Sequence, residues 1–212
     1  MKSKIILIEG IPGAGKTTLI NSLIKNYILA NEKVRTLVSL SQSHTYSPVI
    51  SEENSFYASK NENLNHLDKI LQFLKWGISS GSSESLSNFF CLIDTLHITH
   101  CFRPGNISWP DIVKYDKTLA DVNCKLIFMK ALPETILERA ILPRSKRENL
   151  YLTKYQKRYG NNLNEIHQYY MNEQEKMGVL FENSKLNKIM LYSEQISTNE
   201  KAAYDFWLDN GT

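Results

Sequence analysis

The chain has 212 residues, which is enough for one domain with a full hydrophobic core. Lysine and arginine together number 25 against 22 aspartate and glutamate, and the net charge of +3 is too small for a protein that wraps duplex nucleic acid. The three cysteines are odd in number and form no C-x-x-C pair, which favours free, buried thiols and a cytoplasmic location.

Five short apolar runs predict strands that are buried on both faces, as in a parallel sheet. Because helical patterns alternate with these runs, we expect an α/β fold with right-handed crossovers, formed by residues 1–212 as a single domain. No apolar run approaches the length of a membrane span. The expected strands are 5–8, 34–38, 89–93, 126–129 and 189–192.

The helical patterns have recognisable starts and stops. Ser108 and Asp111 have the spacing of a capping box at a helix start, and Gly77 is the expected stop of an earlier helix. Gly160, followed by two asparagines, predicts a break within a long helical region. The expected helices lie at 19–28, 64–74, 108–120, from Pro133 onward, at 148–182 and at 199–208.

The residues from Gly10 to Thr17 read G-I-P-G-A-G-K-T, the G-x-x-x-x-G-K-T pattern of a phosphate-binding loop (P-loop), between an expected strand and an expected helix. Loop amides and a helix N-terminus form a concave site for a polyphosphate. Lys16 would reach the β and γ phosphates, and the Thr17 hydroxyl would hold Mg²⁺. The pattern therefore predicts binding of a nucleoside triphosphate. The expected binding residues are Gly10, Gly13, Ala14, Gly15, Lys16, Thr17 and Thr18.

Ligands of open α/β sheets bind beyond the carboxyl ends of the strands, so residues that follow the strands are further candidates. Asp94 ends the third strand, where it could bind Mg²⁺ together with Thr17 or accept a proton from an acceptor hydroxyl. The alternative is that it only caps the next helix. His97 is a candidate substrate contact, and a zinc site with His100 and Cys101 is a less favoured alternative.

Three arginines, Arg139, Arg144 and Arg147, follow the fourth strand and the expected helix at Pro133. Planar guanidinium groups match the charge spread of a transferring phosphoryl group better than ammonium groups do. We therefore expect these arginines on a lid at about residues 139–150. A solvated basic surface is the alternative.

The irregular segment after the second strand contains His44, Tyr46 and Phe56, which could contact a nucleobase or pack against the sheet edge. Glu9 lies directly before the P-loop. We expect it to accept a hydrogen bond from a loop amide and to have no catalytic role.

These motifs resemble the deoxynucleoside kinase and thymidylate kinase branch of the P-loop kinases. Residues 7–18 are similar to the opening of those enzymes, 132–148 to their arginine-bearing lid, and Asp94-x-x-His97 to their element after strand three. The resemblance implies a three-layer α/β/α P-loop NTPase fold with a five-stranded parallel sheet in the order 2-3-1-4-5 and a helical lid. It also implies ATP and Mg²⁺ as cofactors.

The sequence thus predicts an ATP- and Mg²⁺-dependent kinase that moves the γ-phosphoryl group to a small acceptor. The favoured acceptor is a nucleoside or nucleoside monophosphate. We expect no nucleic-acid or membrane partner and leave a homodimer open. Two departures from the family's pattern matter: no carboxylate follows the second strand within 38–42, and Thr95 replaces an arginine. There are two alternatives. One is a kinase for a small metabolite or antibiotic, and the other is a non-catalytic ATP-binding module. The expected catalytic residues are Lys16, Asp94, Arg139, Arg144 and Arg147.

Overall fold

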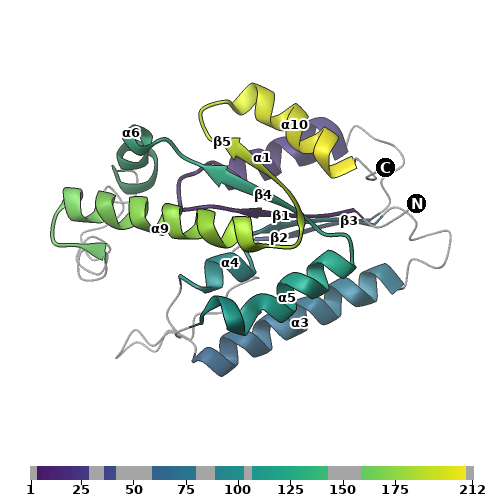
Figure 1. Ribbon diagram of the computed structural model, residues 1–212. Coiled ribbons are helices and arrows are strands. Elements are labelled where there is room, and N and C mark those ends of the chain that lie inside the picture. The colour runs from purple at the N-terminus through teal and green to yellow at the C-terminus, as the bar shows by residue number, and fades with distance from the viewer. Residues whose placement is uncertain are drawn as a thin grey trace, which may run out of the picture.

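The computed structural model of the chain describes residues 4–28, 36–41, 59–79, 89–102, 107–142 and 159–208. Strands and helices alternate along most of it (Figure 1). In chain order they are β1 (Lys4–Glu9), α1 (Lys16–Leu23), the π-helical turn η1 (Ile24–Ile28), β2 (Thr36–Leu40), α3 (Lys60–Ser79), β3 (Phe89–Asp94), α4 (His97–His100), α5 (Trp109–Asp121), β4 (Lys125–Lys130), α6 (Pro133–Ile136), the π-helical turn η4 (Leu137–Ile141), α9 (Leu163–Asn183), β5 (Asn187–Tyr192) and α10 (Ile196–Leu208).

The five strands form one parallel sheet in the order β2-β3-β1-β4-β5, which confirms the predicted order. The four apolar residues at the centre of β1 are at most 1% exposed, as expected for a central strand covered on both faces. Helices α1 and α10 cover one face of the sheet, and α3, α5 and α9 cover the other (Figure 1). The predicted three-layer α/β/α architecture is thereby confirmed.

The predicted strands agree with the observed ones to within two residues, and the helix start at Ser108 is confirmed by a complete capping box with Asp111. Gly77 does not end α3, which continues to Ser79, because a buried glycine on this face is tolerated inside a well-packed helix. The predicted break before α9 occurs at Gly160, where φ is +147°.

Parallel strands bring their carboxyl ends to one edge of the sheet, and in Figure 1 the arrow of β4 points to that edge, beside α6. The P-loop after β1, Asp94 at the end of β3 and the turn after β5 therefore lie at the same edge. None of the helices in the described ranges is long and apolar enough to cross a membrane.

Candidate functional site

The loop between β1 and α1 has a backbone that requires glycine. Gly10, Gly13 and Gly15 have φ values of +143°, +83° and +89°. A Cβ atom on Gly10 would lie 2.4 Å from the carbonyl oxygen of Met129, and one on Gly13 would lie 2.7 Å from the Cα of Ala140. The glycines of the motif thus allow the turn and also a close approach to β4 and η4.

Lys16 begins α1, and its side chain is only 8% exposed. The Nζ atom donates to the carbonyl oxygens of Gly10 at 2.8 Å and of Ile11 at 3.0 Å. The ammonium group is therefore held across the P-loop, at the place where the motif requires a positive charge for phosphate.

Thr17 and Asp94 come together from α1 and β3. The Thr17 Oγ1 atom donates to Oδ2 of Asp94 at 3.1 Å, and Asp94 is 8% exposed. Hydroxyl and carboxylate oxygens are ligands that Mg²⁺ prefers in nucleotide sites. The residues present therefore fit a magnesium ion at the foot of the loop.

The chain turns sharply after Asp94. Thr95 has a φ of +62°, which is unusual for a β-branched residue. Its amide donates to the carbonyl oxygen of Ile8 at 3.0 Å, and its hydroxyl donates to the carbonyl oxygen of Asp94 at 2.6 Å. The conformation is therefore held by one hydrogen bond to β1 and one to the preceding residue, and strain of this kind is concentrated at functional sites.

Glu9 is fully buried, and its partners differ from those expected. The Oε1 atom accepts from the amides of Leu96 at 2.9 Å and Ile98 at 3.1 Å, and Oε2 accepts from the Thr99 hydroxyl. The prediction that Glu9 accepts from a P-loop amide was wrong, because its carboxylate accepts from the segment after β3 instead. The sequence contained one signal, a charged residue directly after the apolar run 5–8 and before the first glycine of the loop.

His97 lies in a buried network rather than at the surface of a pocket. Its Nε2 is 3.0 Å from Oδ1 of Asp116, and both side chains are 0% exposed. Asp116 also accepts from the Ser184 hydroxyl at 2.5 Å and from the Lys185 amide at 2.8 Å. Burial raises the pKa of Asp116, but the hydrogen bonds from His97, Lys185 and Ser184 outweigh it and lower the pKa below its usual value. This geometry favours a structural role for His97 over the expected substrate contact.

The two histidines that the zinc alternative needs, His97 and His100, face other partners. Nδ1 of His100 faces the carbonyl oxygen of Leu96 at 2.5 Å, whereas His97 faces Asp116. Within the described part of the chain, no group of three or more His, Cys, Asp or Glu residues could hold a metal ion.

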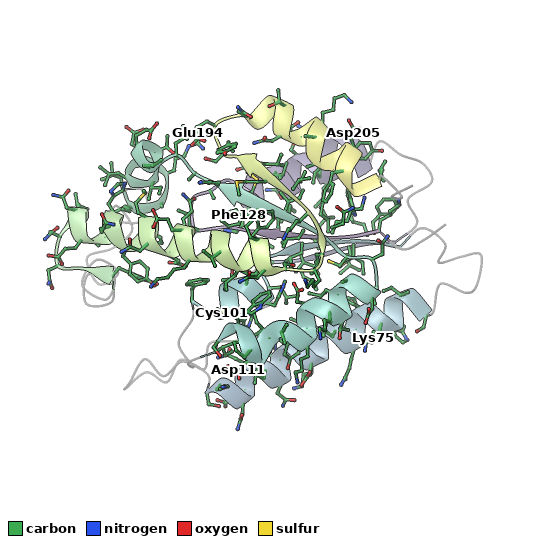
Figure 2. All side chains as sticks on the ribbon, viewed as in Figure 1. Lys75, Cys101, Asp111, Phe128, Glu194 and Asp205 are labelled. Carbon is green, nitrogen blue, oxygen red and sulfur yellow. The ribbon has the colours of Figure 1, made fainter. Side chains whose placement is uncertain are left out.

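Arg139 belongs to η4 and contacts the turn after β5. One guanidinium nitrogen donates to the carbonyl oxygen of Ser193 at 3.0 Å and lies 3.8 Å from Oε1 of Glu194. Glu194 lies beside α6 in Figure 2 and also accepts from the Thr135 hydroxyl at 2.7 Å. Burial raises the pKa of Glu194, but hydrogen bonds, chiefly from Ser193 and Thr135, lower it overall. Arg139 is thus held near the ends of β4 and β5, whereas Asp94 ends β3, on the other side of β1 in the sheet order.

A pocket of about 360 Å³ opens between the P-loop, η4 and the start of α10. Its lining combines loop backbone with polar side chains. The lining residues are Gly13, Gly15, Thr18, Leu19, Met129, Glu138, Arg139, Ser193, Asn199 and Glu200. Three predicted nucleotide-binding residues and one predicted catalytic arginine are therefore brought together.

His44, Tyr46, Phe56, Arg144 and Arg147 lie outside the described residues.

Among solved structures, the chain is similar to the YorR protein from Bacillus subtilis, solved in complex with phosphorylated GDP: the identity is 14% and the TM-score 0.51, over 96% of this chain and 94% of that chain. It is also similar to APE1195, with 18% identity and a TM-score of 0.53 over 97% and 95% of the two chains. A deoxyadenosine kinase from M. mycoides, solved with the products dCMP and dCDP, has 14% identity and a TM-score of 0.46 over 97% of each chain. The likenesses to the YorR protein and to APE1195, with TM-scores above 0.5, show a shared fold.

Comparison with curated proteins gives no match. Residues 6–130 match the family model described as the viral superfamily 1 RNA helicase core domain, and the match begins in β1 and includes the whole P-loop and Asp94. Since it covers more than half of the chain, the chain belongs to this family of P-loop NTPases, and its sheet has the strand order expected for the kinase type.

Proposed function

We propose that the chain is an ATP- and Mg²⁺-dependent kinase that transfers the γ-phosphoryl group to a small acceptor, a nucleoside or nucleoside monophosphate. The observation that carries the proposal is the 3.1 Å contact between the Thr17 hydroxyl and the buried Asp94 carboxylate, directly beneath the P-loop. Two oxygen ligands from different segments at this point are what a nucleotide-bound magnesium ion needs.

The residues of the loop have defined parts in this proposal. Lys16 exchanges the carbonyl oxygens of Gly10 and Ile11 for the β and γ phosphates, because a phosphate oxygen is a stronger acceptor for an ammonium group. Thr17 and Asp94 would hold Mg²⁺, which would supply positive charge to offset the negative charge of the phosphates. Asp94 is alternatively the base for the acceptor hydroxyl.

The pocket beside the P-loop suits the nucleoside part of ATP. Its volume of about 360 Å³ lies in the usual range of ligand sites. Arg139 borders this pocket, and its planar cation can stack on a base or contact a phosphate. The bound phosphorylated GDP of the YorR protein agrees with a nucleotide ligand for this fold.

The acceptor side depends on residues that remain predictions. Arg144 and Arg147 would close over the transferring group from a lid at about 139–150, and His44, Tyr46 and Phe56 would contact the acceptor. Closure would exclude water and so limit hydrolysis. We also propose a cytoplasmic location, because Cys91, Cys101 and Cys124 are all free.

NTP hydrolysis linked to RNA is a second candidate, because the matching family model describes an RNA helicase core. We favour the kinase for a structural reason. The sheet order β2-β3-β1-β4-β5 is the one that the resemblance to nucleoside kinases implies. Glu9, the acidic residue next to the loop, accepts three hydrogen bonds and is not placed to orient an attacking water.

The test compares Lys16→Ala with the control Lys25→Ala, which removes an exposed lysine near the end of the same helical segment. ADP release is measured with a panel of nucleosides, nucleoside monophosphates, sugars and single-stranded RNA. We expect a nucleoside or nucleoside monophosphate to stimulate turnover, and Lys16→Ala to lower it by about 100- to 1,000-fold. Lys25→Ala should match the unsubstituted chain.

Each other outcome contradicts a defined part of the proposal. Full transfer by Lys16→Ala would refute the assignment of the loop. Stimulation by a sugar alone would indicate a small-metabolite kinase, and stimulation by RNA alone would favour the second candidate. Tight ATP binding without turnover on any acceptor would indicate a binding module.

A further inference from the structure

We propose that Glu9 is a positioning residue of the magnesium site: it holds the segment after β3 so that the Asp94 carboxylate stays beside Thr17. The proposal rests on the proposed function, since it concerns the metal that accompanies the nucleotide. It assigns to Glu9 an effect on Mg²⁺ affinity that is separate from any effect on binding of the triphosphate itself.

The contacts of Glu9 all go to one short segment. Its carboxylate is fully buried, and its three donors, the amides of Leu96 and Ile98 and the hydroxyl of Thr99, lie within five residues after Asp94. Glu9 is also the last residue of β1, directly before Gly10 of the P-loop. One side chain therefore links the phosphate-binding loop to the segment that carries the candidate metal ligand.

This segment needs an external acceptor because its own backbone cannot supply one. Thr95 has a left-handed φ of +62°, and Leu96 has φ and ψ of −150° and −113°, so the chain enters α4 through a sharp turn. The first amides of a helix have no acceptor within the helix. The carboxylate of Glu9, at the end of β1, fills that role for Leu96 and Ile98.

The direct strand contacts alone hold only one side of the turn. Asp94 is opposite Ile8 in the sheet register, and the Thr95 amide donates to the Ile8 carbonyl oxygen at 3.0 Å. Beyond Thr95, the hydrogen bonds to β1 come from the Glu9 side chain. Without that carboxylate, the strained turn has room to relax, and the Asp94 side chain is the first group that such a movement displaces from Thr17.

Three substitutions separate positioning from mere stability. Glu9→Ala removes both acceptor atoms. Glu9→Gln keeps one oxygen for the two amides, and its amide group can donate to the Thr99 hydroxyl, so it is the conservative variant. Thr99→Val removes one donor to Glu9 with little change in volume.

The experiment measures ATP binding by calorimetry first without metal and then in a titration with Mg²⁺, and repeats the titration with Mn²⁺ as a spectroscopic probe. Removal of a group that orients a metal ligand commonly weakens metal binding by about 10- to 100-fold. We expect a rise of this size in the Mg²⁺ concentration needed for half-saturation in Glu9→Ala, and about tenfold in Thr99→Val. Metal-free ATP binding should stay close to that of the unsubstituted chain, and Glu9→Gln should restore most of the Mg²⁺ affinity.

An unchanged Mg²⁺ requirement in Glu9→Ala would overturn the proposal, and so would an equal loss of ATP binding with and without metal, which indicates general damage. If Glu9→Ala does not fold, Thr99→Val decides by the same criterion. Failure of the unsubstituted chain to bind ATP at all would contradict the proposed function and this proposal with it, whereas normal binding with unaffected variants would contradict only the role of Glu9.

Discussion

Replacement of Gly13 by alanine tests how closely the P-loop packs against η4. Gly13 has a φ of +83°, and a Cβ atom there would lie 2.7 Å, 2.8 Å and 2.9 Å from the Cα, N and Cβ atoms of Ala140. Two of these three atoms belong to the backbone of a helical turn, which cannot move aside as a flexible side chain can. Either the loop or η4 must shift.

Two physical effects contribute to the expected loss of stability. A left-handed backbone costs an alanine about 1–2 kcal/mol relative to glycine. Overpacking adds about 1–3 kcal/mol, so that Gly13→Ala should lower the free energy of unfolding by about 2–5 kcal/mol. Gly15→Ala isolates the first effect, because φ is +89° there but the nearest atom, Cε of Met129, is 3.8 Å from the added Cβ.

Gly178 provides a matched control within α9. It is helical, and a Cβ atom there meets nothing within 4 Å. Alanine should therefore stabilise the chain by about 0.5–1 kcal/mol, through the lower entropy of its unfolded state. In urea unfolding followed by tryptophan fluorescence, we expect stability to fall in the order Gly178→Ala, unsubstituted chain, Gly15→Ala, Gly13→Ala. Equal stability of Gly13→Ala and Gly15→Ala would refute the packing argument, because it would mean that Ala140 gives way without cost.

Two further predictions concern titratable groups. Hydrogen bonds, first from Lys60 and to a smaller extent from Ser108, lower the pKa of Asp111 to about 2. The pKa of an aspartate in the unfolded chain is about 4. The contribution of Asp111 to stability is therefore present above about pH 4 and is lost as the pH falls toward the pKa of the folded state. The slope of unfolding free energy against pH in this window should be smaller in Asp111→Asn, and an unchanged slope would contradict the assignment. Burial raises the pKa of Cys91 and Cys101 to about 12. Iodoacetamide at about pH 8 should therefore label these thiols slowly in the native chain and rapidly in the urea-unfolded chain. Rapid labelling of both thiols in the native chain would refute the predicted protection.

Local patterns were sufficient to predict the strands of this fold to within two residues. A run such as 5–8 is apolar at every position because β1 is covered on both faces, and in an α/β chain a short run of this kind is typical of a central parallel strand. The π-helical turns at Ile24–Ile28 and Leu137–Ile141 were not predicted. Both continue a preceding α-helix, and a change in hydrogen-bond register leaves the spacing of apolar residues almost unaltered.

The candidate site was predictable where its residues are close in sequence or follow strands. The P-loop is contiguous, and Asp94 could be expected near Thr17 because parallel strands end at one edge of the sheet. The pairing of His97 with Asp116 could not be predicted from the sequence, because it depends on how α5 is rotated against α4. Its one signal is that Asp116 lies next to Tyr115 on the buried face of α5, where an unpaired carboxylate would be costly.

The residues that sequence reasoning missed have a common physical setting. Glu9 and Asp116 are both 0% exposed, and each accepts three hydrogen bonds. The donors to Glu9 lie in residues 96–99, at and just before α4, and the donors to Asp116 are His97 of α4 and residues 184–185 between α9 and β5. A buried carboxylate stabilises a structure only if its acceptor capacity is filled, so each one fixes several segments at once. α4 has only four residues and few hydrogen bonds of its own. Its position, and with it the strained turn at Thr95 that presents Asp94, therefore depends on these two side chains more than on helix propensity.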